Sequence, residues 1–387
     1  DKTINFVGGK QKKNYLNRKK RFMKSKSEHN KFNFNVDNLS SSINHIVFGY
    51  YFNQNVFFLP KNLSSLKFGS EFNRQIDNLP KNLTSLKLGC SFNHWVDNLP
   101  LNLKYLNLGN GFNKTVNNLP PNLIFLSLGY SFNHPIDNLP LSLKLLTTGD
   151  YFYQTVDSLP SNLEYLYLGY CFNESTDDLP SSLKTLIIDN GFYGSVNNLP
   201  LGLKHLTMYN CSDILRNLPS GLISLKIYNY DYDLCYLPQN LKYLTLANNY
   251  CHFDNLPIRL KKLYIDYICL HSFNNLPSDL ECIFIKKIIK ICDCCDYDND
   301  SNDSNDSNDS NDSDNSDDSD DSDDSDDSDD SDDSNNNNDI KKISTYTYEI
   351  TSRPSKLKKI ILNKSIANAR IYFENNKLFD DVQIIIN

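Results

Sequence analysis

The stretch that decides the fold is Leu79 to Asn98, which reads LPKNLTSLKLGCSFNHWVDN. The Leu-Pro pair that opens this stretch recurs along most of the chain. It stands at 59/60, 79/80, 99/100, 119/120, 139/140, 159/160, 179/180, 199/200, 218/219, 237/238, 256/257 and 276/277. A period of 20 residues, shortened to 19 in three of the later units, predicts a solenoid in which each period is one structural unit.

The first half of the unit predicts a short strand. Leu83, Leu86 and Leu88 read L-x-x-L-x-L, and the last two point to the same side of an extended chain because they are two residues apart. Copies of this pattern begin at residues 43, 63, 83, 103, 123, 143, 163, 183, 203, 222, 241, 260 and 280. Thirteen parallel strands, each with one face in the core, are therefore expected.

The second half of the unit predicts a return path without a long helix. Gly89 suits a bend with positive φ after the strand, and Phe92 and Val96 bring apolar bulk back to the interior. Pro100 has no N–H to donate to a sheet, so it belongs in the turn before the next strand. Twenty residues leave no room for a long helix, and the convex side is expected to be extended or 3₁₀-like.

Asparagine recurs at one position of the unit. Because Asn side chains bond to nearby backbone groups, stacked amides are expected to satisfy the backbone of the convex turn. The residues are Asn53, Asn73, Asn93, Asn113, Asn133 and Asn173.

The whole pattern resembles the FNIP repeat, a short relative of the leucine-rich repeat found in amoebae and in the large viruses that infect them. The resemblance covers residues 32 to about 285 and rests on Phe-Asn pairs at 52/53, 72/73, 92/93, 112/113, 132/133 and 172/173. Val56, Ile76, Val96, Val116, Ile136 or Thr176 follows three residues after each Asn. It implies a β-rich solenoid of the leucine-rich-repeat type, with a parallel sheet and little α-helix. After Leu206 the Phe-Asn element is eroded, and the convex turns there depart from the family pattern.

Charge divides the 387 residues into four segments. The net charge is −8, yet residues 296–339 hold 21 aspartates and no basic residue, so the rest of the chain carries +13. The predicted segments are a basic, disordered stretch at 1–31, the solenoid at 32–291, a Cys cluster with a disordered Ser/Asp/Asn acidic tract at 292–339, and a last repeat with a cap at 340–387. The solenoid itself is almost neutral.

The end of the chain repeats the strand pattern once more. Pro354, Leu357, Ile360 and Leu362 follow the spacing of the earlier units, so the acidic tract is expected to loop out between two repeats. Solenoids need capped ends, and the apolar residues between 371 and 386 suit that role.

The sequence predicts an intracellular protein, cytoplasmic in the host or amoebal cell. It contains no run of about 18 apolar residues that would cross a membrane, and its basic start is not followed by the apolar core of a secretory signal. The ten cysteines fit a reduced protein without a disulfide framework.

No enzymatic activity or cofactor is expected. The seven histidines do not stand with partners in a nucleophile or metal arrangement, and no Gly-rich phosphate loop is present. Cys292, Cys294 and Cys295 form a C-x-C-C cluster that would suit a soft metal together with Cys282, but no further Cys or His pair completes a tetrahedral site. Incidental reduced thiols are the favoured interpretation, and no metal site is predicted.

The outward positions of the strands predict a surface for a partner protein. Between Tyr105 and Ile187 they carry aromatic and aliphatic side chains, which mark interaction sites when exposed, although cross-strand packing would also explain them. The candidate contact residues are Tyr105, Phe125, Tyr165, Tyr167, His205, Tyr243 and Tyr264.

Two alternatives stand beside this hypothesis. The resemblance implies that the chain could be the substrate-recognition subunit of an F-box-type ubiquitin ligase, with ligase components as partners and the F-box truncated or upstream of Asp1. The basic termini favour nucleic-acid binding, which predicts strongly salt-dependent affinity that is lost when residues 1–31 are deleted. A solvated tail is the favoured interpretation of the basic N-terminal segment, so nucleic acid is the less favoured partner.

Overall fold

The computed structural model describes residues 3–6, 33–37, 39–209, 215–229, 234, 236–247, 255–269, 276–289, 353–362 and 381–386. Within them, sixteen strands form one parallel sheet in which each strand pairs with its neighbours in the sequence. The strands are β1 (Thr3–Phe6), β2 (His45–Phe48), β3 (Ser65–Lys67), β4 (Ser85–Lys87), β5 (Tyr105–Asn107), β6 (Phe125–Ser127), β7 (Leu145–Thr147), β8 (Tyr165–Leu168), β9 (Thr185–Ile188), β10 (His205–Met208), β11 (Ser224–Tyr228), β12 (Tyr243–Ala247), β13 (Lys262–Cys269), β14 (Cys282–Ile289), β15 (Lys359–Leu362) and β16 (Gln383–Ile386).

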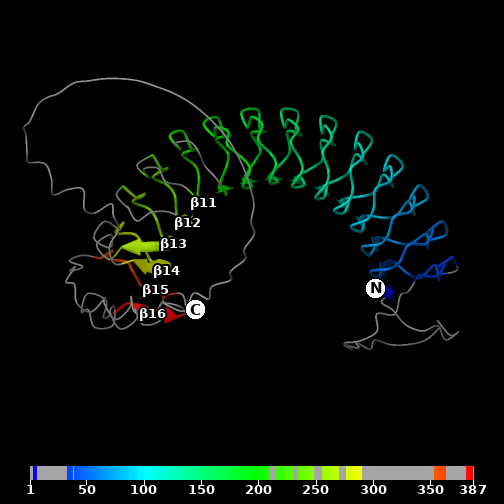
Figure 1. Cartoon of the computed structure of the whole chain (residues 1–387), viewed down its shortest axis with the longest axis horizontal. Coiled ribbons are helices and arrows are strands. Elements are labelled where there is room, and N and C mark those ends of the chain that lie inside the picture. The colour runs from blue at the N-terminus through cyan, green and yellow to red at the C-terminus, as the bar shows by residue number, and fades with distance from the viewer. Residues whose placement is uncertain are drawn as a thin grey trace, which may run out of the picture.

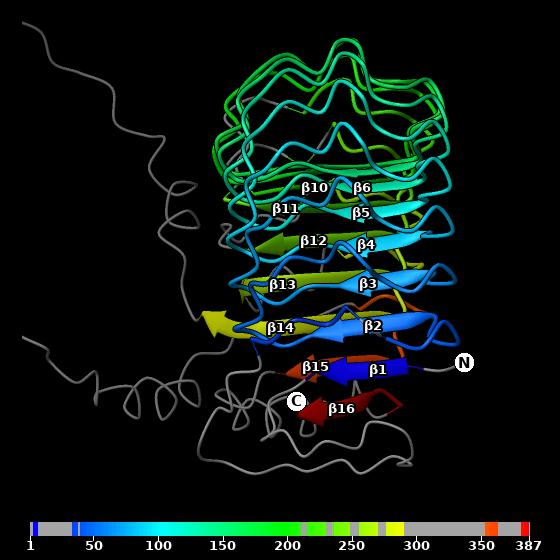
Figure 2. The same cartoon turned by 90° about the vertical axis from the view of Figure 1, so that its right-hand side faces the viewer.

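The repeats stack into an arc. The strands run along its inner side and the turns along its outer side (Figure 1). Seen from the side, the strands lie one above another in parallel (Figure 2). None of the described residues forms a helix. The predicted fold class, a parallel β-solenoid with units of about 20 residues, is confirmed.

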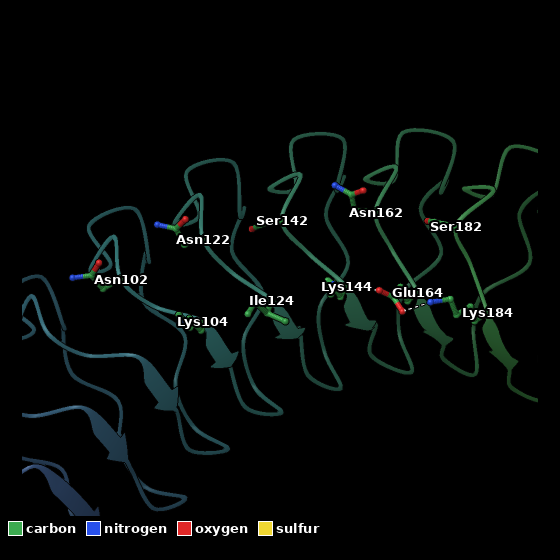
Figure 3. A pocket seen from close by; sticks show the side chains of 10 residues that line it. All are labelled: Asn102, Lys104, Asn122, Ile124, Ser142, Lys144, Asn162, Glu164, Ser182 and Lys184. Atoms are coloured by element: carbon green, nitrogen blue, oxygen red, sulfur yellow. Dashed lines mark hydrogen bonds and ion pairs between the residues drawn. The ribbon is translucent and has the colours of Figure 1, made fainter.

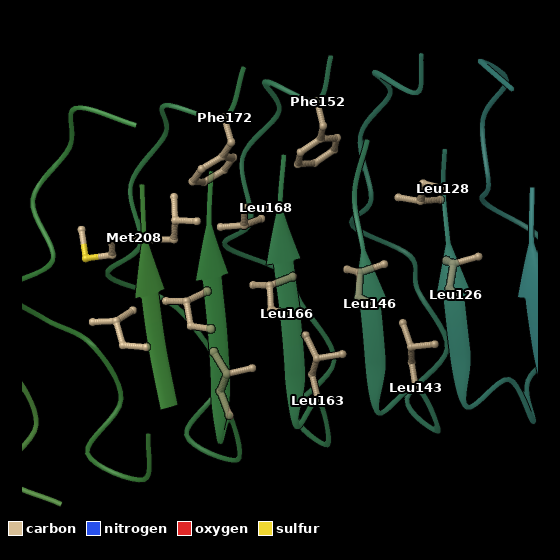
Figure 4. Close-up of a cluster of buried hydrophobic side chains, with 14 of the residues drawn as sticks. Leu126, Leu128, Leu143, Leu146, Phe152, Leu163, Leu166, Leu168, Phe172 and Met208 are labelled. Carbon is tan, nitrogen blue, oxygen red and sulfur yellow. The ribbon is translucent and has the colours of Figure 1, made fainter. Parts of the chain in front are cut away.

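The core consists of rows of identical positions. Leu66, Leu86 and Leu106 pair in register on successive strands, and each is almost completely buried. The strand burial pattern alternates, so one side of each strand faces the interior and the other faces solvent on the inner side of the arc. Figure 4 shows the equivalent residues of later repeats, Leu126, Leu146 and Leu166, in a row that crosses the strands, with the rings of Phe152 and Phe172 beside them. Each repeat therefore buries its apolar face only against its neighbours.

A spine of phenylalanines fills the interior beyond the strands. Eight rings one repeat apart, from Phe52 to Phe192, stack nearly parallel, with centroids 6.0–6.4 Å apart. Strands in a sheet lie only ~4.8 Å apart. Because the rings are spaced more widely than the strands, the stack bends toward the sheet, and the strand face lines the inside of the arc.

Stacked asparagine amides satisfy the backbone of the convex turn, as predicted. The Oδ1 atom of each Asn accepts the backbone N–H of the equivalent residue one repeat later. Successive bonds of 2.8–3.3 Å link each residue to the next in the series Asn33, Asn53, Asn73, Asn93, Asn113, Asn133 and Tyr153, and one further bond links Asn173 to Tyr193. Tyr153 has no amide to offer to the Asn173 N–H, so the ladder is interrupted between Tyr153 and Asn173.

A second ladder, which we did not predict, joins the turns before the strands. The side-chain amide nitrogen of Asn102 donates to the Lys81 carbonyl at 3.0 Å, and that of Asn122 donates to the Leu101 carbonyl at 3.2 Å. The turn itself is closed within each unit, because the N–H of Leu103 donates to the Pro100 carbonyl at 3.0 Å. The prediction that Pro100 lies in a turn is confirmed.

The prediction of a positive φ at Gly89 is wrong. Among the glycines that the structure describes, φ is positive at Gly109, at 80°, and at Gly129, at 90°. At Gly89 the requirement is a close approach between repeats, because an added Cβ would lie 1.7 Å from the Gly69 carbonyl oxygen. Glycine is needed after the strand for lack of space, even where the backbone angle would suit any residue.

The C-terminal segment continues the sheet. β15 pairs in parallel with β14, and the N–H of Leu357 donates to the Pro354 carbonyl at 3.1 Å, as in the earlier units. The Lys356 ammonium contacts the Asp279 carboxylate at 2.6 Å and lowers the pKa of that group. The boundaries of the four segments stay predictions. The acidic tract, Cys292, Cys294, Cys295 and the eroded convex turns at 210–214, 230–233 and 248–254 lie outside the described residues.

Candidate binding surface

Three of the predicted contact residues form one continuous stripe on the strand face, together with a leucine that lies between two of them. Tyr105, Phe125, Leu145 and Tyr165 pair in register on β5, β6, β7 and β8. Tyr105 is 49% exposed, and the other three are half-buried. We call these four residues the central stripe. Their side chains point away from the leucine core, so the stripe presents apolar surface on the inner side of the arc.

Tyr167 lies beside the central stripe but is held in place. Its hydroxyl donates to Oδ2 of Asp189 at 2.6 Å, across one repeat. Burial raises the pKa of Tyr167, and the hydrogen bond and charge of Asp189 raise it further. Burial also raises the pKa of Asp150, and the Asp189 carboxylate adds to this effect. Tyr167 therefore stays a neutral phenol in a fixed orientation at physiological pH.

The remaining predicted residues lie farther along the arc. His205 is exposed at the start of β10. Tyr243 on β12 is 38% exposed, and the Lys262 ammonium lies over its ring at 5.9 Å. The seven predicted residues therefore share the strand face but do not form a single patch.

A pocket marks the strand face at β13 and β14. The rings of Tyr264 and Phe284 stack with centroids 3.9 Å apart and line a cavity of about 320 Å³ together with Ile361. At its edge the Lys286 ammonium contacts the Asp266 carboxylate at 3.1 Å. Tyr264, which was predicted from its outward position, thus belongs to a hollow with apolar walls and a charged rim.

Three exposed tyrosines beyond the strand ends were missed. Tyr130, Tyr151 and Tyr170 are 45%, 51% and 52% exposed, and the first two rings meet edge to face at 5.0 Å. The hydrogen bond between Tyr130 and Tyr151 raises the pKa of Tyr130. Each follows the glycine that ends the strand pattern by one or two residues, as in Gly129-Tyr130 and Gly149-Asp150-Tyr151. Tyrosine does not recur there with the period of the repeat, so the sequence pattern did not reveal them.

A groove runs along the flank of the solenoid where the strands begin. It has a volume of about 690 Å³ and spans five repeats. Figure 3 shows two rows of side chains along it. One row stands beside the strand starts and the other lies nearer the outer turns. The groove is lined by Asn102, Lys104, Asn122, Ile124, Ser142, Lys144, Asn162, Glu164, Ser182 and Lys184. We call it the flank groove.

An acidic residue between two lysines lies in the flank groove. Glu164 contacts the Lys144 ammonium at 2.9 Å and the Lys184 ammonium at 2.6 Å, and all three side chains reach solvent. The hydrogen bonds from Lys184 and Lys144 lower the pKa of Glu164 to about 2. Glu164 is therefore fully ionised at physiological pH, and the two ammonium groups are held at fixed positions along the groove.

The lysines of the flank belong to a longer row. The position just before each strand carries a lysine in seven described units, and glutamate in two. The lysines are Lys104, Lys144, Lys184, Lys204, Lys242, Lys261 and Lys358. We call them the lysine row. Glu164 and Glu281 are the only acidic residues at this position among the described units.

The described residues offer no evident catalytic or metal centre. No group of three or more His, Cys, Asp and Glu side chains is placed among them to hold a metal ion. Burial raises the pKa of the Cys282 thiol, which disfavours the thiolate that binds a soft metal. Within the described ranges, no helix is long and apolar enough to cross a membrane.

Comparisons with known proteins identify the repeat. The model of the FNIP Repeat matches residues 30–70, 55–91, 72–111, 132–171 and 154–191. No curated protein matches the chain.

Two solved structures are similar to the chain. CroV588, described as a novel circular LRR protein from a giant virus, has 30% sequence identity and a TM-score of 0.56 over 67% of this chain. The chain spans about half of that protein, 49% of its length. YopM from Yersinia enterocolitica WA-314 has 19% identity and a TM-score of 0.34, with 64% of this chain and 74% of that chain covered.

Proposed function

Because the chain contains FNIP repeats, in a leucine-rich-repeat-like fold that is typical of protein–protein interaction, we propose that it is a non-enzymatic scaffold that binds a partner protein on its strand face. Repeat families of this type are generally scaffolds. The observation that carries the proposal is the central stripe, with Tyr105, Phe125 and Tyr165 on the inner side of the arc.

The shape and the composition of the strand face favour it over the rest of the arc as the site that binds a partner protein. A curved solenoid presents an extended concave face, and every residue on that face can contact one bound partner. Exposed apolar patches mark interaction sites, and tyrosine is enriched among the residues that contribute most binding energy. The pocket beside Tyr264 adds a hollow for one side chain of the partner.

The proposal places the protein in the cytoplasm of the host or amoebal cell. Cys90, Cys171 and Cys282 are free thiols, which suits a reducing compartment. None of the described residues favours the ubiquitin-ligase alternative, which requires an F-box outside the repeats. Nucleic-acid binding through the basic termini stays the less favoured alternative.

A comparative capture experiment tests the proposed function. The full chain, the variant Phe125→Ala/Tyr165→Ala and the convex-side control Tyr153→Ala/Tyr193→Ala are immobilised and exposed to amoebal lysate. Both control residues are more than half exposed on the outer turns. Proteins that bind the wild type and the control, but are depleted at least about tenfold by the strand-face variant, support the proposal. Equal capture by all three chains contradicts it.

A further inference from the structure

We propose that the flank groove is a second docking site, separate from the strand face, for an acidic amphipathic helix of a partner protein. The groove lies at the strand starts (Figure 3). The central stripe lies on the strands themselves. The inference rests on three features of the flank, namely its charge, its exposed leucines and its dimensions.

The charge of the flank favours an anionic occupant. The lysine row supplies an ammonium at seven described repeats, whereas the same position carries an acidic residue in only two others. Within the lysine row, Lys104, Lys204, Lys242 and Lys358 form no ion pair with a described residue. The amide nitrogens of Asn102, Asn122 and Asn162 already donate to backbone carbonyls, so the ammonium groups are the donors that the groove offers to a ligand.

Exposed leucines follow the same flank. Leu101 and Leu141 directly precede two residues that line the groove, and they are 68% and 70% exposed. The same position carries Lys61 and Lys81 in earlier repeats, so the fold does not require leucine there. Pro121 is exposed at the same position in the repeat between Leu101 and Leu141, so the row is apolar over three successive repeats, and contiguous exposed apolar surface marks interaction sites. The occupant therefore combines carboxylates with aliphatic side chains.

The spacing fits an α-helix aligned with the stack. Leu101 and Leu141 are two repeats apart, and ~4.8 Å per strand at the sheet sets their separation along the stack at roughly 10 Å or more. In a helix, residues seven apart are separated by roughly 10.5 Å along the axis. The five repeats that line the groove span roughly 19 Å at the sheet, the length of about 13 helical residues. A helix with aliphatic residues seven apart and glutamates on the adjoining face would contact both rows.

The chain's own acidic tract does not meet these requirements. Residues 300–334 contain only Ser, Asn and Asp, so the tract has no aliphatic side chain for Leu101 and Leu141. The occupant is therefore a segment of another protein, and the tract serves as a control in the test.

The test uses a labelled 18-residue helical peptide that carries glutamates on one face and leucines seven residues apart. Fluorescence anisotropy measures its binding to the full chain. Three comparison probes are the same peptide with serine in place of leucine, the same peptide with lysine in place of glutamate, and a peptide with the sequence of residues 318–333. Only the acidic peptide with leucines is expected to bind tightly.

Matched variants locate the site. Lys104→Gln/Lys144→Gln/Lys184→Gln is expected to weaken binding at least about tenfold, and Leu101→Ser/Leu141→Ser about fivefold. Lys67→Gln/Lys114→Gln/Lys226→Gln removes the same charge elsewhere and should change the affinity less than twofold. The strand-face variant Phe125→Ala/Tyr165→Ala should bind the peptide normally, which separates this result from the test of the proposed function. Circular dichroism checks that each variant is folded.

Several outcomes overturn the proposal. One is that the acidic peptide with leucines does not bind the wild-type chain. Another is that the two triple-lysine variants lose affinity for this peptide equally. A third is that the peptide with serine in place of leucine binds as tightly as the peptide with leucines. Tighter binding of a 15-nucleotide single-stranded DNA than of the peptide, lost in the same groove variant, would instead assign the flank to nucleic acid.

Discussion

The backbone N–H of Asn93 donates to Oδ1 of Asn73, one repeat earlier, at 3.1 Å. This contact repeats along the convex turn and links each unit to the next by a side chain. The carbonyl of Asn73 in turn accepts a hydrogen bond from the His94 ring at 3.2 Å. Both oxygen atoms of Asn73, the side-chain Oδ1 and the backbone carbonyl oxygen, therefore accept hydrogen bonds from the next repeat.

Replacement of one ladder residue should destabilise the fold. Asn113→Ala removes the acceptor of the Asn133 N–H, and loss of one such hydrogen bond costs about 1 kcal/mol. Chemical denaturation of Asn113→Ala and of the exposed control Asn117→Ala measures the free energy of unfolding. The account fails on this point if the two variants have the same stability.

Repair of the interrupted ladder should stabilise the fold. Tyr153→Asn supplies an amide oxygen for the Asn173 N–H, and the 56% exposed Tyr153 ring contributes little packing. The free energy of unfolding should rise by about 1 kcal/mol. Tyr153→Ala lacks the amide and is the control. A comparable gain in both variants would show that removal of the ring, and not the new hydrogen bond, is responsible.

Truncation of the phenylalanine spine should have a larger effect. Phe112 is completely buried, with the Phe92 and Phe132 rings 6.2 and 6.1 Å away. Phe112→Ala should lower the free energy of unfolding by about 3–5 kcal/mol. Trp95→Ala removes a larger ring that is 56% exposed and should cost less than about 1 kcal/mol. Similar melting curves for the two variants would contradict a spine that carries the packing.

The ion pairs of Glu164 should be visible in its titration. Its pKa of about 2 lies below the ordinary 4.5, so the two ion pairs stabilise the folded state fully above about pH 4.5. This contribution is lost as the pH falls through about 2. The carboxyl ¹³C shift of Glu164, followed by NMR, should titrate near pH 2 in the wild type. In Lys144→Gln/Lys184→Gln it should return toward 4.5, and an unchanged midpoint would exclude the lysines as the cause.

The fold was largely predictable because one period of 20 residues governs the whole stack. Strand positions, the buried face and the asparagine ladder all follow from residues that repeat in register. The need for Gly89 was predicted for the wrong reason, since the closeness of the Gly69 carbonyl depends on how tightly repeats stack. The curvature was not predictable, because it arises from the difference between ring spacing and strand spacing.

The candidate surface was predictable only in part. Alternation along each strand identified Phe125 and Tyr165 as outward residues. The hydrogen bond from Tyr167 to Asp189 crosses a turn between repeats, so the pattern within one strand does not reveal it. The flank groove was missed because it is formed by the two positions flanking Leu103 and its equivalents, which vary in residue type and show no apolar period.

The most direct test of the central claim is the affinity of a captured partner for the strand face, measured by isothermal titration calorimetry. Phe125→Ala/Tyr165→Ala should weaken binding at least about tenfold, or about 1.4 kcal/mol, while circular dichroism stays unchanged. Tyr153→Ala/Tyr193→Ala should bind as the wild type does. Equal affinities for the wild type and the strand-face variant would contradict the claim.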